Sequence, residues 1–381
     1  MKILYVTDVE GNWDYFLRFV RTVATSPHSA GALSLVDGRL VLQPGYIFVF
    51  GGDVGDKGNG TLRLVHLLVD AKQRYPDRVV LIAGNRDVNK MRWTSEFTDA
   101  EMNLATMDPG IKDGPHWIPE ASRKHLGIVP YLTQLLDAQA ATTAPVTEVD
   151  LTTVNTPVRP DETSLRLVTG AGSGENLQHY VNTGAAYSVI AGRHLEPSGM
   201  PKLMPQMLTD VLWAQGYRRM LVGHTPHGNT PTIVKHRVTR NHPPPGVFQV
   251  VMCDTSYSDT RAPDMRGRCT SIVVVDHPTA SQDTAAWRRG DDDRAHLWIE
   301  GHLDLSQPPL VLDEVYGYCP EHDRFVGHVL AHTGEWVKAP LANDRYLVCT
   351  VTNAHTYTYA VKSTAELARF AAPTTGVQRL E

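Results

Sequence analysis

Side chains that bind divalent cations recur at one kind of place in this chain. Asp8 and Glu10 directly follow a short apolar run, ILYVT at residues 3–7. Carboxylate, amide and imidazole groups are common protein ligands of divalent metal ions, so several of them together indicate a metal site. Polar residues follow four later apolar runs in the same way: Asp53, Asp56, Asn85, Arg86, Asp87, His224, His227 and Asp254.

The apolar runs themselves have the length and composition of buried strands, and segments with helical spacing of apolar residues lie between them. This alternation predicts an α/β protein with helices packed on the faces of a sheet. Because ligands bind beyond the carboxyl ends of strands in such sheets, we expect five polar loops to converge on one crevice. The predicted strands are 3–7, 46–50, 78–83, 165–169, 219–222, 248–253 and 270–276, and the predicted helices are 13–24, 61–75, 130–141 and 207–217.

Two regions depart from this alternation. Residues 96–165 are rich in Pro, Thr and Asp and show little periodicity, which predicts an inserted lobe or lid. From about residue 305 onward, apolar and polar residues alternate between turn signals, which is typical of antiparallel strands. We therefore expect a main domain over 1–304 and a small antiparallel β module over 305–381.

The composition is that of a folded protein. Of 381 residues, 42% are hydrophobic and 20% are charged, near the average for globular domains. The net charge is −5 and no long basic block occurs, so we expect neither nucleic acid nor a membrane as a main partner. No apolar stretch approaches the roughly 20 residues that span a bilayer.

The cysteines and the N-terminus predict a cytoplasmic protein. Cys253, Cys269, Cys319 and Cys349 are scattered and form no C-x-x-C pair, so neither a zinc knuckle nor a disulfide framework is indicated. The first apolar run is short and is interrupted at Asp8, unlike a signal peptide.

Four ordered blocks resemble those of the calcineurin-like metallophosphoesterases. DVEGN at 8–12, GDVGDKG at 52–58, GNRD at 84–87 and GHTP at 223–226 are similar to the family's D-x-H-G-N, G-D-x-x-D-R-G, G-N-H-D/E and G-H-x-H/P. Within that superfamily they look most like the phosphoprotein phosphatase and symmetrical diadenosine tetraphosphatase branch. The resemblance covers about residues 1–276 and is sparse between 96 and 215.

This resemblance implies a four-layer α/β/β/α sandwich that holds two divalent metal ions. Asp8 and the residue at position 10 would hold one ion, and Asp53 would bridge to the second. Asn85, His224 and a histidine from the middle of the chain would complete the second site. A water between two such ions ionises near neutral pH and attacks phosphorus, so the resemblance implies a phosphoesterase.

Two catalytic positions depart from the family pattern. Glu10 stands where the family usually has histidine, and its oxygen ligand favours Mn, with Mg or Fe possible, over zinc. Arg86 replaces the histidine that assists the leaving group, and arginine does not release a proton in the working pH range. Arg86 can instead clamp phosphoryl oxygens while Asp56 faces it as an ion pair. We therefore expect phosphoanhydrides or aryl phosphates to be better substrates than alkyl phosphates.

The middle histidine has no clear counterpart in the sequence. His194 in AGRHLEPSG and His179 in LQHY are the stand-ins, and a histidine of a surface loop is the alternative reading of His194. Three further residues complete the predicted substrate pocket: Lys57 to meet phosphate, His227 as a pocket residue, and Asp254 to order the loop of His224 or to hold substrate.

Several alternatives stay open at this point. The chain is a metal-dependent hydrolase of a phosphorylated small molecule or of a phosphoprotein, or it is a binding or scaffold protein that lost catalysis through the changes at 10 and 86. A Ser/Thr protein phosphatase needs open grooves around the metals, whereas a lid over 96–165 favours a small substrate. The sequence leaves the oligomeric state open.

Overall fold

The computed structural model describes residues 1–29, 31–56, 58–90, 192–238, 246–255, 270–276, 296–303, 314–318, 325–330, 333–341, 343–353 and 356–370. The chain divides into two units, residues 1–86 with 192–381 and residues 87–191. The first unit carries nearly all described residues, including every strand and the helices other than α3. The predicted insert (96–165), strand 165–169, helix 130–141 and His179 lie outside the described residues.

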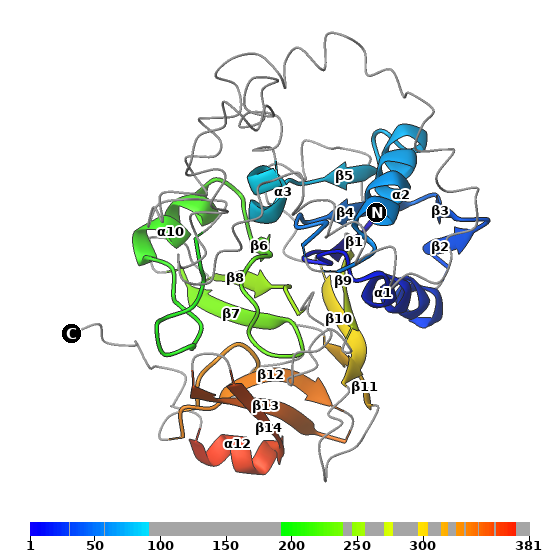
Figure 1. The fold of residues 1–381 in the computed structure, drawn as a ribbon. Coiled ribbons are helices and arrows are strands. Elements are labelled where there is room, and N and C mark those ends of the chain that lie inside the picture. The colour runs from blue at the N-terminus through cyan, green and yellow to red at the C-terminus, as the bar shows by residue number, and fades with distance from the viewer. Residues whose placement is uncertain are drawn as a thin grey trace, which may run out of the picture. The chain divides into compact units, whose positions relative to one another are not determined.

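Strands and helices alternate in the first half of this unit, and strands dominate its second half (Figure 1). The strands are β1 Lys2–Val6, β2 Leu33–Val36, β3 Arg39–Leu42, β4 Tyr46–Phe50, β5 Val79–Leu81, β6 Arg219–Val222, β7 Thr232–Arg237, β8 Val247–Met252, β9 Thr270–Asp276, β10 His296–Leu303, β11 Glu314–Tyr318, β12 Trp336–Leu341, β13 Arg345–Asn353 and β14 Thr356–Ser363. The helices are α1 Trp13–Thr25, α2 Thr61–Arg74, α3 Asn85–Lys90, α10 Gln206–Ala214 and α12 Thr364–Phe370.

The strands form a long sheet and three smaller ones. The long sheet has the order β11-β10-β9-β1-β4-β5, in which β1 pairs parallel with β4 and antiparallel with β9. The second sheet has the order β6-β8-β7, with β6 parallel to β8. Strands β12, β13 and β14 form an antiparallel sheet, here called the C-terminal sheet, and β2 pairs with β3 as a hairpin.

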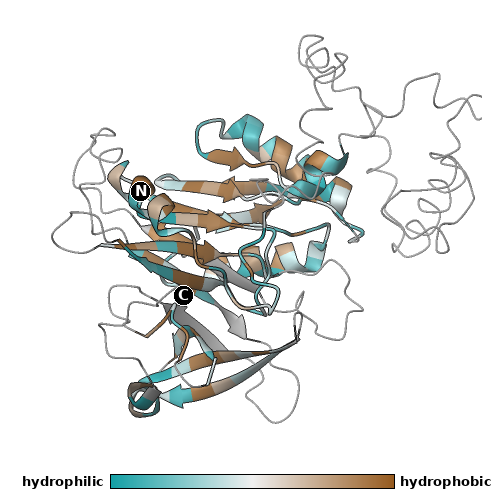
Figure 2. Ribbon diagram, turned by 90° about the vertical axis from the view of Figure 1, so that its left-hand side faces the viewer, coloured by the Kyte–Doolittle hydropathy of each residue, from teal (hydrophilic) through white to brown (hydrophobic). Residues whose placement is uncertain are grey.

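Alternating side chains of β1 show that the long sheet is covered on both faces. Leu4 and Val6 pack in the hydrophobic core that α1 and α2 share with this sheet. Tyr5 points to the opposite face, because successive side chains of a strand alternate, and packs in a second core with Ile233 and Val251. In Figure 2 the strand that begins at the N-terminus, β1, is coloured mostly brown, as expected for a strand buried on both faces of a sheet.

Strand β8 alternates in the same way. Val251 joins the core shared with the long sheet, whereas Phe248 and Val250 face a third core that includes Trp213 of α10. The layers are therefore helix, sheet, sheet and helix. The predicted α/β class, with four layers, is confirmed.

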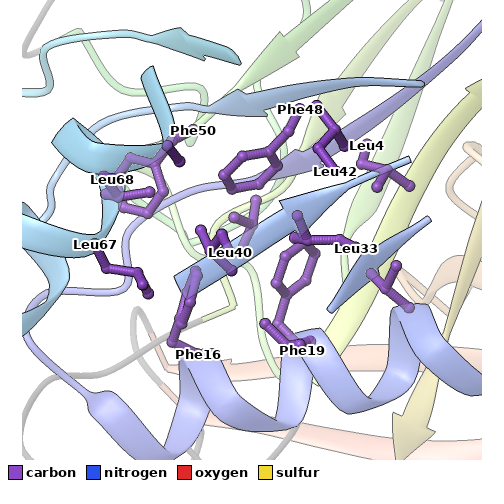
Figure 3. Close-up of a cluster of buried hydrophobic side chains, with 14 of the residues drawn as sticks. Leu4, Phe16, Phe19, Leu33, Leu40, Leu42, Phe48, Phe50, Leu67 and Leu68 are labelled. Atoms are coloured by element: carbon purple, nitrogen blue, oxygen red, sulfur yellow. The ribbon is translucent and has the colours of Figure 1, made fainter. Parts of the chain in front are cut away.

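Aromatic rings of α1 fill the core between that helix and the long sheet (Figure 3). The ring centroids of Phe16 and Phe19 lie 6.0 Å apart, and Phe19 stacks on Phe48 of β4 at 6.0 Å. Leu33 and Leu40 of the β2–β3 hairpin pack against the same rings. Each fully buried side chain of this size contributes roughly 1.5–3 kcal/mol, so this core fixes α1 against β1 and β4.

Helix α1 begins at the end of the first polar block. The side chain of Asn12 accepts a hydrogen bond from the Tyr15 backbone N at 3.0 Å and so caps the helix. Asn12 therefore fixes where the loop after β1 ends. No helix within the described ranges is long and apolar enough to cross a membrane.

Some elements differ from the sequence-based expectation. The hairpin β2–β3, strand β7 and strand β10 were not predicted, although Asp37 and Gly38 have φ angles of 48° and 74°, typical of the turn that an Asp-Gly pair favours. The predicted domain boundary at 304/305 falls between β10 and β11, which pair in the long sheet. The division into 1–304 and 305–381 stays a prediction.

Candidate metal centre at the strand ends

The loops after β1 and β4 are joined through their backbones. The N–H of Asp8 donates to the carbonyl of Gly52 at 3.0 Å, and that of Glu10 donates to Asp53 at 2.9 Å. The Gly58 N–H returns a hydrogen bond to the Glu10 carbonyl at 3.0 Å. These bonds hold Asp8, Glu10 and Asp53 in one place, at the carboxyl ends of two parallel strands.

Asp53 also contacts the loop after β5. Its side chain is 3% exposed, and its Oδ1 accepts a hydrogen bond from the Arg86 backbone N at 2.8 Å. A Cβ atom at Gly84 would lie only 2.1 Å from Asp53 Oδ1. Glycine at this position therefore allows the GNRD block to approach the carboxylate.

Asp8 links the long sheet to the second sheet. Its carboxylate accepts a hydrogen bond from Thr7 Oγ1 at 2.6 Å and others from the His224 backbone N at 3.0 and 3.1 Å. Gly223 permits this contact, since a Cβ there would lie 2.3 Å from Asp8 Oδ2. The segment 223–229 after β6, here called the His224 loop, thus meets the loop after β1.

Negative charge accumulates around Asp8, which is 2% exposed. Burial raises the pKa of the Asp8 carboxyl well above its usual range, and the neighbouring carboxylates of Asp254, Asp53 and Glu10 raise it further. Asp254 is itself buried, so the loop after β8 reaches the same place. A bound cation would relieve this repulsion, because an adjacent positive charge favours the ionised form of each carboxyl.

The side-chain oxygen of Asn85 is buried next to the loop that carries Asp53. Its side chain is 9% exposed, and Oδ1 has no hydrogen-bond partner in the part of the chain that the structure describes. An unsatisfied buried acceptor costs roughly 1–3 kcal/mol, so such atoms in a folded protein call for an explanation. A cation bound by the amide oxygen would supply one.

Four candidate ligands have left-handed backbone angles. The φ angles are 52° at Asp8, 50° at Glu10, 55° at Asp53 and 62° at His224. Each costs about 1–2 kcal/mol for a residue with a Cβ, and such strain gathers at functional sites. All four strained residues lie just beyond strands, where this turn keeps the polar residue close to the strand end.

Arg86 lies between two acidic side chains. Its Nη2 is 3.5 Å from Asp56 Oδ2, so the expected ion pair with Asp56 is present. Its Nε is 3.7 Å from Glu10 Oε1, a contact that the sequence did not predict. The Arg86 side chain is 43% exposed, so it can still meet a ligand from solvent.

The remaining predicted residues lie in different surroundings. The His194 backbone N donates to Thr225 Oγ1 at 3.4 Å, which puts His194 beside the His224 loop. His227 is 1% exposed, and its Nδ1 lies 3.0 Å from Thr232 Oγ1, so the structure buries it and does not present it to solvent. Lys57 lies outside the described residues.

Within the described ranges, no three side chains of His, Cys, Asp or Glu are grouped so as to hold one metal ion. In this conformation, hydrogen bonds from Thr7, His224 and Arg86 occupy carboxylate oxygens of Asp8 and Asp53. The donor set still fits a hard divalent cation, because it combines buried carboxylates with the amide oxygen of Asn85, for which the described residues supply no hydrogen-bond partner.

Two functional contacts escaped the sequence reasoning. Thr7 directly precedes the block DVEGN, yet only the fold shows that its hydroxyl donates a hydrogen bond to Asp8. Tyr15 Oη and Thr255 Oγ1 lie 2.9 Å apart and join α1 to the loop that carries Asp254. The Asp-Thr pair at 254–255 was the available signal for Thr255, whereas the apolar periodicity of α1 gave none for the Tyr15 hydroxyl.

Comparison with known proteins finds one family. Residues 1–140 match the model of the family described as calcineurin-like phosphoesterase. Among curated proteins, none is significantly similar to the chain.

Two solved structures illustrate the distant structural similarity. A protein serine/threonine phosphatase from Saccharomyces cerevisiae with similarity to human phosphatase PP5 is 13% identical, over 82% of each chain, with a TM-score of 0.36. A cold-active protein-tyrosine phosphatase of a psychrophilic Shewanella species is 15% identical, over 72% of this chain and 75% of that one, with a TM-score of 0.35. Similarity this distant does not bear on the substrate.

Proposed function

Because residues 1–140 match the model of the calcineurin-like phosphoesterase family, we propose that the chain is a metal-dependent hydrolase of a phosphoester or phosphoanhydride. The observation that carries the proposal is the buried carboxylate cluster of Asp8, Asp53 and Asp254 beside an amide oxygen of Asn85 that lacks a partner among the described residues. Buried like charges are unfavourable unless a cation neutralises them.

Two divalent ions would share the residues at the strand ends. Asp8 and Glu10 would hold the first, and Asp53 would reach both. Asn85 and His224 would hold the second, as the residue-by-residue match to the family's blocks implies. His194 is the candidate for a further ligand, because its backbone already contacts the His224 loop. The oxygen-rich donor set favours Mn, with Mg or Fe as alternatives.

The side chains of the chain itself then bind and orient the substrate. Bound divalent ions supply Lewis-acid activation of a water molecule and of the phosphoryl group. Arg86 offers a guanidinium fork for two phosphoryl oxygens, and Asp56 positions it through their ion pair. Because Arg86 does not donate its proton, leaving groups that depart as stable anions are expected: phosphoanhydrides and aryl phosphates.

The substrate is a phosphorylated small molecule in this proposal, and a phosphoprotein is the alternative. A second candidate, binding without hydrolysis, is favoured by one observation. Arg86 pairs with Glu10 as well as Asp56, so the residue at position 10 has a protein partner that competes with a metal ion. Metal analysis of the purified protein separates the two, since a binding protein of this kind would hold less than one divalent ion per chain.

Hydrolysis of 4-nitrophenyl phosphate with added Mn²⁺ tests the proposal, with Asp53→Asn as the decisive variant. Loss of the bridging carboxylate should lower the rate by about 100-fold or more, as removal of a group that stabilises transition-state charge does. The matched control is Asp37→Asn, because Asp37 also has a left-handed φ, 48° against 55°, but lies exposed in the β2–β3 turn. Equal activity in the folded Asp53→Asn and Asp37→Asn proteins would refute the assignment.

A further inference from the structure

We propose that the C-terminal sheet holds the His224 loop in its working conformation, with Lys338, Tyr357 and Tyr359 as positioning residues. The inference rests on the proposed function, since it assigns a role to residues around the proposed ligand His224. Figure 1 shows β12–β14, in orange and brown, beside β7 of the second sheet.

Three side chains of the C-terminal sheet bond to the backbone of the His224 loop. Lys338 Nζ donates to the His227 carbonyl, and the Tyr357 hydroxyl donates to the Pro226 carbonyl at 3.3 Å. The Tyr359 oxygen accepts a hydrogen bond from the Asn229 N–H at 2.6 Å. Neighbouring backbone groups of the loop are therefore satisfied by side chains more than a hundred residues away in the sequence.

A β-bulge directs Lys338 toward the loop. In the pairing of β12 with β13, Val337 faces Val348 and Ala339 faces Leu347, so Lys338 is the extra residue between two paired positions. Bulges re-aim a side chain, and Lys338 is only 1% exposed. A lysine ammonium is costly to bury unless its donors are satisfied, and the His227 carbonyl takes one of them.

The ring of His227 also packs against aromatic rings of the C-terminal sheet. Its centroid lies 5.1 Å from that of Tyr357, with the planes at 81°, and 6.4 Å from that of Trp336, at 80°. Trp336 Nε1 also donates to the Ile233 carbonyl at 3.1 Å, which joins β12 to β7. The predicted pocket residue His227 is thus an anchor that seats the loop on the C-terminal sheet.

The loop is consequently held at both ends. Its first residues meet the long sheet, because the His224 N–H donates to Asp8. Its last residues, 226–229, meet the C-terminal sheet. If the contacts with the C-terminal sheet are lost, the loop keeps only the hydrogen bonds from the His224 N–H to Asp8. The orientation of the His224 imidazole is then less well fixed. Mutation of groups that orient a metal ligand through contacts of this kind typically lowers metal affinity by 10–100-fold.

The test compares wild type with Tyr359→Phe, which removes one oxygen, and Lys338→Met, which removes the ammonium. The first readout is hydrogen exchange of residues 224–229 in metal-free protein, measured by mass spectrometry. We expect about tenfold faster exchange in this loop and little change in β8, because each variant removes one hydrogen bond of the loop. The second readout is Mn²⁺ affinity by electron paramagnetic resonance, expected to weaken about tenfold.

Matched controls lie in the same sheet. Tyr346→Phe changes a tyrosine whose ring packs on Phe325, with centroids 5.4 Å apart. Lys362→Met changes a lysine whose Nζ pairs with Glu335. Both controls alter the sheet at positions away from the His224 loop, so we expect neither exchange of the loop nor Mn²⁺ affinity to change.

Each outcome decides the inference. Unchanged loop exchange in folded Tyr359→Phe and Lys338→Met overturns it, whether or not the protein binds metal. Faster exchange with unchanged Mn²⁺ affinity in a protein that binds Mn²⁺ also overturns it, because the contacts would then serve stability alone. If wild type binds no Mn²⁺, the proposed function fails by itself, and faster loop exchange in the two variants still supports the role of the C-terminal sheet.

Discussion

The two sides of the proposed metal centre are held by different means. On the long-sheet side, loops meet backbone to backbone, as in the bonds from Asp8 to Gly52 and from Glu10 to Asp53. On the second-sheet side, the His224 loop is held by side chains of Lys338 and Tyr359 from the C-terminal sheet. Substitutions that add atoms between the closely packed loops should therefore disturb the long-sheet side most. Substitutions that remove a hydrogen-bonding side-chain group should disturb the second-sheet side most.

The largest effect is expected from Gly84→Ala, which should displace the candidate ligands on the long-sheet side. Its Cβ would lie 2.1 Å from Asp53 Oδ1 and force the carboxylate or the loop to move. A misplacement of about 1 Å can lower activity by about 100-fold, which a Mn²⁺-dependent phosphatase assay would detect.

Gly38→Ala is the control for this substitution. It introduces a Cβ at a φ of +74° but meets no atom within 4 Å, so it should cost stability and leave activity intact. Similar activities in the Gly84→Ala and Gly38→Ala proteins would show that the approach of the GNRD block does not matter.

Thr7→Val should destabilise the junction between the two sides. It removes the hydroxyl that donates to Asp8 Oδ2 at 2.6 Å, and an intramolecular hydrogen bond contributes about 0.5–1.5 kcal/mol. Urea unfolding at neutral pH measures the loss. Thr7→Ser keeps the hydroxyl and should retain most of the stability, so equal losses in both variants would point to packing instead.

On the second-sheet side, His227 should lower the stability of the folded protein in mild acid. Burial and then the charge of Lys338 lower the pKa of His227 well below its usual value of about 6.5. The unfolded chain therefore binds more protons than the folded chain below pH 6.5, and stability is lost as the pH falls from there. At pH 5.5 the His227 contribution to this loss is about 1.4 kcal/mol relative to pH 7.5.

His227→Gln isolates that contribution. The difference in unfolding free energy between pH 7.5 and pH 5.5 should be smaller by about the same amount in the variant, because glutamine does not titrate. An unchanged difference would mean that His227 is not held neutral by its buried position.

The smallest effect concerns Asn85 on the long-sheet side, whose buried side-chain oxygen has no hydrogen-bond partner among the described residues. Asn85→Leu should stabilise metal-free protein by at most about 1 kcal/mol, because it removes an unsatisfied buried acceptor. The same variant should abolish much of the rise in melting temperature that Mn²⁺ produces in wild type. A lower stability of metal-free Asn85→Leu together with an unchanged Mn²⁺ effect would contradict a ligand role.

The long-sheet side could be predicted from the sequence more fully than the second-sheet side. Helices α1 and α2 and the strands β1, β4, β6 and β8 follow from apolar periodicity, which depends on neighbours a few residues apart. The polar blocks of the long-sheet side were visible for the same reason. The Asp56–Arg86 ion pair followed from the resemblance, since the two residues stand at matching positions of two blocks.

The contacts of the second side could not be predicted in the same way. Lys338 and Tyr359 carry no motif, and their partners lie 111 and 130 residues away. The direction of Lys338 depends on a bulge whose register the sequence does not specify. The proposed additional ligand His194 is a related case, because it comes near the His224 loop only through the tertiary fold.

The left-handed backbone of Asp8, Glu10, Asp53 and His224 has an evolutionary consequence. Positions of this kind accept glycine, asparagine and aspartate far more readily than other residues. A single change from Asp to Asn at position 8 or 53 would thus remove one carboxylate from the site while keeping the backbone turn. The proposed hydrolase therefore lies one substitution away from a folded protein that lacks a metal-binding carboxylate.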